Sequence, residues 1–192
     1  MTNVYDKLEE KQAWAKAGGK DSPRAAKWLE TRMFVRDRVR MLLDGEPEFE
    51  DGLLAGIGKD VPADAVVTVI GSVAGRKVAI IANDFTCKAG TWGYQTFLKI
   101  TRFQELALTL KIPLIYLVDS AGARIDEQKE CFLGRRAWGN IWHNQVKMSG
   151  AIPQICVLFG PSPAGAAYIP GLCETVIMVD KQATAFLGSP RM

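Results

Sequence analysis

The sequence predicts an α/β domain with a largely parallel sheet. Short runs rich in valine and isoleucine recur along the chain, helix-favouring segments separate them, and two of the runs end in turns of small residues. Strand, helix and strand in repetition are typical of this class. A chain of 192 residues suits one such domain, preceded by a helical arm.

The arm is expected over residues 1–50. Residues 3–17 are charged and helix-favouring, and they end at two glycines. A second helical stretch begins at Pro23, directly after the capping residue Ser22, and runs to Leu43. Its apolar positions recur at helical spacing. We expect this arm to pack on the main body or on another subunit.

The main body is expected over residues 51–192, after a loop rich in Gly, Asp and Pro. The runs 66–73 and 77–82 lie on either side of Gly75-Arg76 and predict a β-hairpin. An amphipathic helix and then alternating strands and helices follow. The predicted ranges are a helix at 95–110, a strand at 114–118, a helix at 129–150, a strand at 154–159, a helix from Ala164, and strands at 175–180 and 184–187.

Composition narrows the class of protein. A formal charge of +3, from 24 basic and 21 acidic residues, is too small for a general nucleic-acid binder. No apolar run reaches the roughly 18 residues that a membrane span needs, and the N-terminus lacks the apolar core of a signal peptide, so we expect a cytoplasmic protein. The chain has one histidine, and its four cysteines are far apart, which predicts small apolar residues or free thiols and no metal site.

Two turns of small residues follow the strands at 114–118 and 154–159. They read DSAGAR and GPSPAGAAY. Small residues let the backbone approach a ligand closely, and the first turn of a helix has amides without internal partners. The amides of Ala164 and Gly165 are therefore candidates to hold the oxygen of an enolate or a tetrahedral intermediate. The alternative interpretation is tight packing of a helix on the sheet, which also calls for small residues.

The sequence offers no convincing nucleophile. The phosphate-binding and nucleophile-elbow patterns GxxxxGK[ST], GxGxxG and GxSxG are missing at the strand ends. The remaining candidates for acid–base or nucleophilic work have simpler roles as surface residues or helix caps; they are Ser120, Ser162, His143, Asp119, Asp126, Glu127 and Glu130. Stabilising an oxyanion without a nucleophile suits reactions that pass through a thioester enolate.

Five segments, in the same order, resemble a known family. They are Arg36–Asp44, Val78–Thr86, Asp119–Ile125, Ser149–Ile155 and Gly160–Tyr168. The pattern is similar to that of the carboxyltransferase (beta) subunits of biotin-dependent acyl-CoA carboxylases, of the propionyl-, acetyl- and methylcrotonyl-CoA carboxylase type. The resemblance covers most of residues 32–192.

The resemblance implies a crotonase/ClpP-like ββα superhelix with an N-terminal helical arm, and a site for an acyl-CoA. It assigns the catalytic amides that hold the enolate oxygen to Ala164 and Gly165, where many members have Gly-Gly. It implies that the first turn shapes the acyl-CoA pocket, that two residues of the second turn line it, and that four cations are candidates for the CoA phosphates. These substrate-binding candidates are Gly122, Ala123, Arg124, Ala166, Tyr168, Lys88, Lys99 and Arg102, with Arg124 both in the turn and among the cations. For each cation a surface role is the alternative.

The implied reaction moves carbon dioxide from carboxybiotin to the α-carbon of an acyl-CoA. The resemblance implies that biotin is carried on a partner, a biotin carboxyl carrier protein that works with a biotin carboxylase subunit. It also implies a similar C-terminal half, absent from this chain, whose own turn holds biotin. A homo-oligomer is expected, because the family's active site lies between subunits.

Three alternatives remain open. Ile125–Gln128, Arg135-Arg136 and Pro163–Gly165 resemble the carboxyltransferase subunit of glutaconyl-CoA decarboxylase, which runs the reaction backwards. A crotonase-type hydratase or isomerase would need a carboxylate on the helix after the second turn, and the nearest is Glu174. The third alternative is a non-catalytic acyl-CoA-binding half-subunit.

Overall fold

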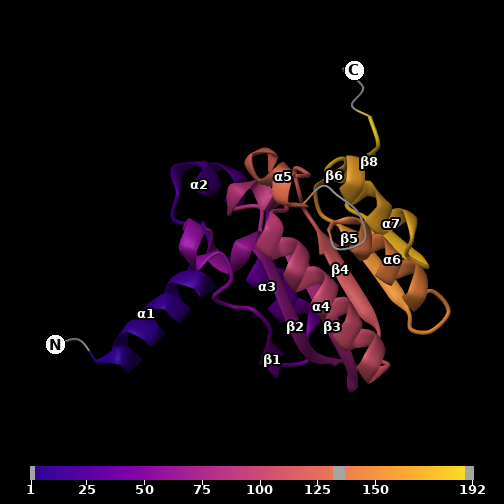
Figure 1. The fold of residues 1–192 in the computed structure, drawn as a ribbon, viewed down its shortest axis with the longest axis horizontal. Helices are drawn as coiled ribbons and strands as arrows, with labels where there is room; N and C mark the ends of the chain where they lie inside the picture. The colour runs from indigo at the N-terminus through magenta and orange to yellow at the C-terminus, as the bar shows by residue number, and fades with distance from the viewer. Residues whose placement is uncertain (1–2, 132–136, 189–192) are drawn as a thin grey trace.

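A computed structural model describes residues 3–131 and 137–188. Its main sheet has the strand order β1-β2-β3-β4-β5-β7 (Figure 1). The first two pairs are antiparallel and the rest are parallel. The strands are β1 (Phe49–Glu50), β2 (Val66–Val73), β3 (Arg76–Asn83), β4 (Leu114–Val118), β5 (Gln154–Leu158) and β7 (Thr175–Met178). A second, two-stranded parallel sheet pairs β6 (Pro161–Pro163) with β8 (Thr184–Phe186).

Helices cover both faces of the main sheet. The α-helices are α1 (Val4–Ala17), α2 (Pro23–Leu29), α3 (Val35–Leu42), α4 (Tyr94–Leu110), α5 (Gln128–Cys131), α6 (Gly139–Met148) and α7 (Tyr168–Gly171). Short 3₁₀ turns are η1 (Ile57–Lys59), η2 (Pro62–Ala65), η3 (Lys88–Gly90), η4 (Ile125–Glu127) and η6 (Ala164–Ala167). In Figure 1, α1 extends away from the body and α4 crosses the sheet.

Two hydrophobic cores form because successive side chains of a strand point to opposite faces. On one face, Phe103 of α4 and Ile141 of α6 pack against β4 residues such as Tyr116. On the other face, Val35 and Val39 of α3 pack against residues of β2 and β3. The result is a three-layer α/β arrangement, which confirms the predicted class.

The predicted hairpin is confirmed, and β2 pairs with β3 along its whole length. The single long helix predicted from Pro23 to Leu43 is wrong. The chain leaves the helix at Glu30 and re-enters after Phe34, whose backbone is extended (φ −60°, ψ 145°). Because of this break, Arg32 lies between the two helices, and its side chain pairs with Asp119 at the end of β4. Tertiary contacts therefore override a continuous helical pattern.

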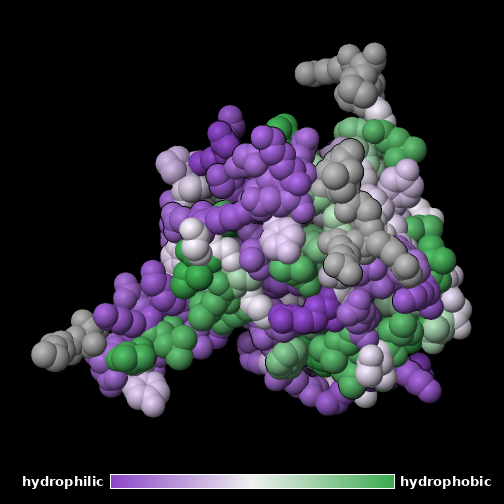
Figure 2. All heavy atoms as spheres, in the orientation of Figure 1, coloured by the Kyte–Doolittle hydropathy of each residue, from purple (hydrophilic) through white to green (hydrophobic). Residues whose placement is uncertain are grey.

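Strand β7 forms one edge of the main sheet, and its four residues are all exposed. Ile177 is 54% exposed and Met178 49%. Figure 2 shows apolar surface on this C-terminal side of the molecule. Separately, none of the helices within residues 3–131 and 137–188 is both long and apolar enough to cross a membrane.

A buried ion cluster joins the arm to the end of β4. Asp119 is fully buried, with Arg38 of α3 at 2.9 Å and Arg32 at 3.3 Å. The Arg38 guanidinium also lies 4.3 Å from the centre of the Phe159 ring, at the end of β5. A Cβ on Gly160 would collide with Asp119 Oδ1, so this position must be glycine. The cluster fixes the arm against the point where both strands end.

Replacing Asp119 by asparagine is expected to lower the free energy of unfolding by about 3 kcal/mol, because Arg38 is then buried without its counter-charge. Urea unfolding measures the change. The matched control is Asp37→Asn, which breaks an exposed pair with Arg40 and should cost under about 1 kcal/mol. Equal effects of the two variants would contradict the importance of this cluster.

Candidate functional site

The two turns predicted from the sequence lie side by side. Parallel pairing of β4 with β5 sets Val118 opposite Leu158, so both strands end at the same edge of the sheet. Beyond the strands, the backbone amide of Ser120 donates to the carbonyl of Pro161 at 2.9 Å. The turns are thus hydrogen-bonded directly to each other, and neither moves alone.

Glycine is required in the first turn. Gly122 has φ = +100°, a region that L-residues rarely adopt, and an added Cβ would lie 3.2 Å from Pro163 Cγ of the second turn. Its carbonyl accepts from the amide of Trp92, and the amide of Arg124 donates back to the Trp92 carbonyl. These two backbone hydrogen bonds therefore fix the first turn to the segment before α4.

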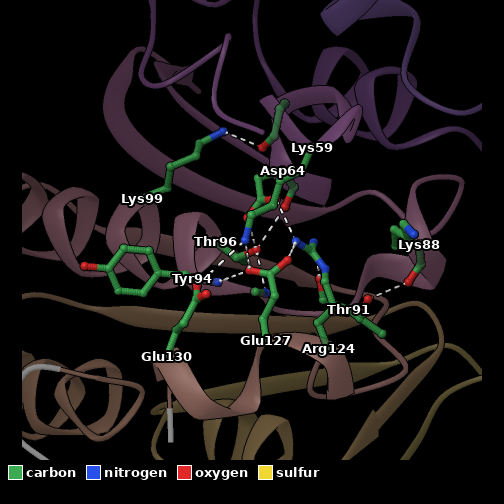
Figure 3. A network of polar contacts seen from close by, with 12 residues as sticks. Lys59, Asp64, Lys88, Thr91, Tyr94, Thr96, Lys99, Arg124, Glu127 and Glu130 are labelled. Atoms are coloured by element: carbon green, nitrogen blue, oxygen red, sulfur yellow. Dashed lines mark hydrogen bonds and ion pairs between the residues drawn. The ribbon is translucent and has the colours of Figure 1, made fainter. Parts of the chain in front are cut away.

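The side chain of Arg124 extends from this turn toward Asp64, Glu127 and Thr91 (Figure 3). Its Nη1 lies 2.8 Å from both Asp64 Oδ1 and Glu127 Oε1, and Nη2 donates to the Thr91 carbonyl at 3.0 Å. Asp64 in turn accepts from the hydroxyl of Thr96 at 2.6 Å. This network ties the η2 loop and the start of α4 to the DSAGAR turn.

Glu127 joins three elements through its carboxylate. It accepts from Arg124, from the backbone amide of Tyr94 at the start of α4, and from Lys59 of η1. Burial alone would raise the pKa of Glu127, but these hydrogen bonds and charges outweigh it and hold the pKa at about 2. The residue therefore stays ionised and is structural, as its interpretation as a helix cap suggested.

The second turn carries the two predicted amides at its start. Ala164 has φ = +49° and begins the 3₁₀ turn η6, and Gly165 follows it. The residue before Ala164 is Pro163, which pairs with Phe186 in the β6–β8 sheet. The hydroxyl of Ser162 donates to the Ala166 carbonyl at 2.8 Å and fixes the turn from inside. A positive φ in alanine costs on the order of 1 kcal/mol, and η6 is held in place by these contacts.

A cavity of about 260 Å³ adjoins both turns. Its wall combines the backbone of the two turns with three indole rings, and it consists of Trp92, Gly122, Ala123, Trp138, Trp142, Ala164, Gly165 and Ala166. An apolar hollow beside the backbone of two turns is suited to an uncharged group that carries one polar oxygen.

Of the residues expected around the pocket, Gly122, Ala123, Ala164, Gly165 and Ala166 are all in the wall of this cavity. Tyr168 is 47% exposed and packs against Trp142, with ring centres 5.1 Å apart. The three tryptophans were not among the residues predicted from the sequence. The spacing of Trp138 and Trp142 indicates one helix face, but it does not say that this face meets a turn.

The four candidate cations lie in different settings. Lys88 is exposed in η3, beside the first turn. Arg102 is on α4 and pairs with Asp51 at 2.7 Å. Lys99 is buried, and its ammonium donates to the carbonyls of Ala63 and Val66, while burial lowers its pKa to about 8.

The expectation that Lys99 and Arg124 bind the CoA phosphates is corrected by their burial. Their side chains are 3% and 5% exposed, and their donors are directed to carbonyls and carboxylates inside the protein. A cation committed in this way has no face to offer a phosphate in solvent. The sequence could not show this, because buried and exposed cations look alike in a single chain.

The other polar candidates are accounted for as follows. Ser120 Oγ accepts from the amide of Gly122, and His143 is exposed on α6. Glu174 accepts from the backbone amide of Gln154 at 2.8 Å, so its carboxylate already has a structural partner. The Arg135-Arg136 pair, cited for the resemblance to glutaconyl-CoA decarboxylase, lies outside the described residues.

The pKa of Glu127 predicts a pH effect. Its folded pKa of about 2 is below the ordinary value of about 4.3, so the stability it contributes is present above pH 4.3 and is lost as the pH falls through 2. Between pH 6 and pH 3 the wild-type protein should lose about 2 kcal/mol of unfolding free energy that Glu127→Gln does not lose. Urea unfolding at each pH measures this. Glu130→Gln, whose side chain is 59% exposed, is the control. Parallel curves for wild type and Glu127→Gln would contradict the role.

The chain is similar in sequence to proteins named as carboxylases. A carboxylase of Bacillus subtilis, YngE, described as uncharacterized, is 57% identical over 84% of this chain, and the match covers 32% of the YngE length. The biotin-dependent 3-methylcrotonyl-coenzyme A carboxylase beta1 subunit of Mycobacterium tuberculosis is 40% identical over 95% of this chain and 36% of its own length. The chain thus spans about a third of the length of these relatives.

Solved structures of a transcarboxylase and a carboxylase subunit are similar to this chain as well. The transcarboxylase 12S structure, described as a hexamer assembly with methylmalonyl-coenzyme A bound, superposes with a TM-score of 0.88 at 31% identity over 100% of this chain and 39% of that chain. The beta subunit of Pseudomonas aeruginosa geranyl-CoA carboxylase gives 0.77 at 32% identity, over 96% of this chain and 34% of that one. These likenesses confirm the expected crotonase-like fold. Residues 28–192 also match the carboxyl transferase domain, and the chain therefore belongs to the carboxyl transferase domain family.

Proposed function

We propose that this chain is the N-terminal, acyl-CoA-binding part of the carboxyltransferase component of a biotin-dependent acyl-CoA carboxylase. Residues 1–50 serve as its arm and residues 51–192 as the acyl-CoA-binding domain. The observation that carries the proposal is the position of Ala164 and Gly165, at the start of η6, in the wall of the tryptophan-lined cavity. Similarity to proteins named as carboxylases supports it.

In the proposed reaction the thioester oxygen of the acyl-CoA lies against the amides of Ala164 and Gly165. When the α-carbon loses its proton, which biotin would accept once its carboxyl group has left as carbon dioxide, negative charge develops on that oxygen. The α-carbon then forms its new bond to the carbon dioxide. Fixed amides stabilise this charge without reorganising, and one such donor is typically worth about 2.7–4 kcal/mol of barrier. The three indoles exclude water around the acyl group, which strengthens these hydrogen bonds.

The carboxyl group would come from biotin on a carrier protein, which supplies carbon dioxide when it is bound. The tryptophan-lined cavity is suited to one thioester, and the two turns beside it are both used in its wall. We therefore assign the biotin contact to a C-terminal half and to the carrier and biotin carboxylase partners. An oligomer is proposed by analogy with the hexamer named for transcarboxylase 12S. Lys88 and Arg102 remain the candidates for the CoA phosphates.

The reverse reaction is the second candidate. One relative, 33% identical over 99% of this chain, is named methylmalonyl-CoA decarboxylase subunit alpha, from Veillonella parvula. Carboxylation and decarboxylation share the same enolate, so the same two amides serve both directions. A hydratase is disfavoured, since it needs a free carboxylate near the second turn and Glu174 is bonded to Gln154.

The assignment of the oxyanion contact can be tested with butyryl-CoA and its thioether analogue S-butyl-CoA, which lacks the carbonyl oxygen. Amide signals of the ¹⁵N-labelled chain are followed during each titration. Butyryl-CoA should shift the Ala164 and Gly165 amide protons downfield, because they bond to the thioester oxygen, and S-butyl-CoA should not. The Ser120 amide, already bonded to Pro161, is the internal control.

Equal shifts with both compounds, or none with either, would contradict the proposal. The reaction itself is measured as transfer of labelled carbon from carboxybiotin to butyryl-CoA after the C-terminal half is added. Binding of butyryl-CoA without transfer would favour the non-catalytic half-subunit.

A further inference from the structure

We propose that Trp142 determines which acyl groups this site accepts, and that the accepted class is uncharged and apolar. The inference rests on the proposed function, because it assumes that the acyl group of a CoA thioester occupies the tryptophan-lined cavity.

Trp142 joins the second turn to the cavity wall. Its Nε1 donates to the Gly165 carbonyl at 3.1 Å. An added Cβ on Gly165 would lie 2.9 Å from Trp142 Cζ2, so the ring lies directly against this glycine. The ring also packs on Tyr168 from the solvent side. The indole is therefore held at its nitrogen and on its face, next to the amides that receive the thioester oxygen.

The helix that carries Trp142 is anchored on both sides. The Asn144 side chain donates to the Thr101 carbonyl of α4, and the Gln145 side chain donates to the Ile169 carbonyl of α7. Both residues are buried. Because α6 is tied to its neighbours immediately after Trp142, the ring cannot retreat when a larger group enters. A fixed wall discriminates by size, whereas a mobile one adapts.

The chemistry of the wall defines the class of acyl group. No charged side chain lines the cavity within residues 3–131 and 137–188. A carboxylate at the far end of an acyl chain would lose its hydration there without a partner cation from residues 3–131 and 137–188. Methylene groups gain by burial instead, with roughly fourfold tighter binding for each one that fits.

The test measures dissociation constants of the full chain for CoA and for acetyl-, butyryl-, pentanoyl-, hexanoyl- and glutaryl-CoA by calorimetry. Wild-type protein should bind tighter with length until the cavity is full, and glutaryl-CoA should bind more weakly than an apolar chain of equal length. Trp142→Phe removes part of the wall and should shift the preference toward hexanoyl-CoA by at least about fivefold relative to acetyl-CoA. The matched control is Trp14→Phe, on α1 and outside the cavity, which should leave the profile unchanged.

A second variant works in the opposite direction. Ala123 is exposed and lines the cavity, so Ala123→Val fills it with little risk to folding and should shift the preference toward acetyl-CoA. Its result keeps the test decisive if Trp142→Phe fails to fold, which circular dichroism would reveal.

The outcomes distinguish failure of the role proposed for Trp142 from failure of the proposed function. If wild-type protein binds acyl-CoAs but both variants keep its length profile or weaken every compound equally, the role of Trp142 is wrong while the proposed function stands. If glutaryl-CoA binds as tightly as an apolar chain, the assigned class is wrong. If wild-type protein binds no acyl-CoA at millimolar concentration, the proposed function fails, and this inference fails with it.

Discussion

The parallel pairing of β4 with β5 determines where everything else at the site lies. It brings two chain segments about forty residues apart to one edge of the sheet, and the bond from Ser120 to Pro161 then joins their turns. Close contact follows, since Gly122 lies against Pro163 and Gly160 against Asp119. A register shift of one residue would turn every side chain of β5 to the opposite face and separate the turns.

The buried charges of this protein support the backbone rather than perform chemistry. Asp119 with its two arginines holds the turns from the side of the arm, and Asp64 with Arg124 and Glu127 holds them from the side of α4. Such groups are costly to bury, and they are retained where a unique backbone geometry matters. Four left-handed residues lie in the segments that these contacts fix; they are Ala63, Asp64 and Ala65 in η2 and Ala164 in η6.

The sequence predicted the order of strands and helices, the hairpin and both turns, because these depend on local periodicity and on small residues at strand ends. It did not predict the break between α2 and α3 or the short strands β1 and β6, since all three depend on contacts with distant segments. Ala164 and Gly165 line the cavity, whereas Lys99 and Arg124, expected to face solvent, are buried. Burial of a long cation depends on what the fold places above it, and spacing along a helix does not reveal that.

Strand β7 has a consequence for handling the protein. One side of it has no neighbouring strand in the described part of the chain, and its exposed residues include Val176, Ile177 and Met178. Backbone N–H and C=O groups that are unpaired along such an edge can form hydrogen bonds with an extended polypeptide, including a second copy of the same molecule. Concentrated samples of this chain would then gather into β-linked aggregates, and a single lysine in place of Ile177 would be a solubility-enhancing change remote from the tryptophan-lined cavity.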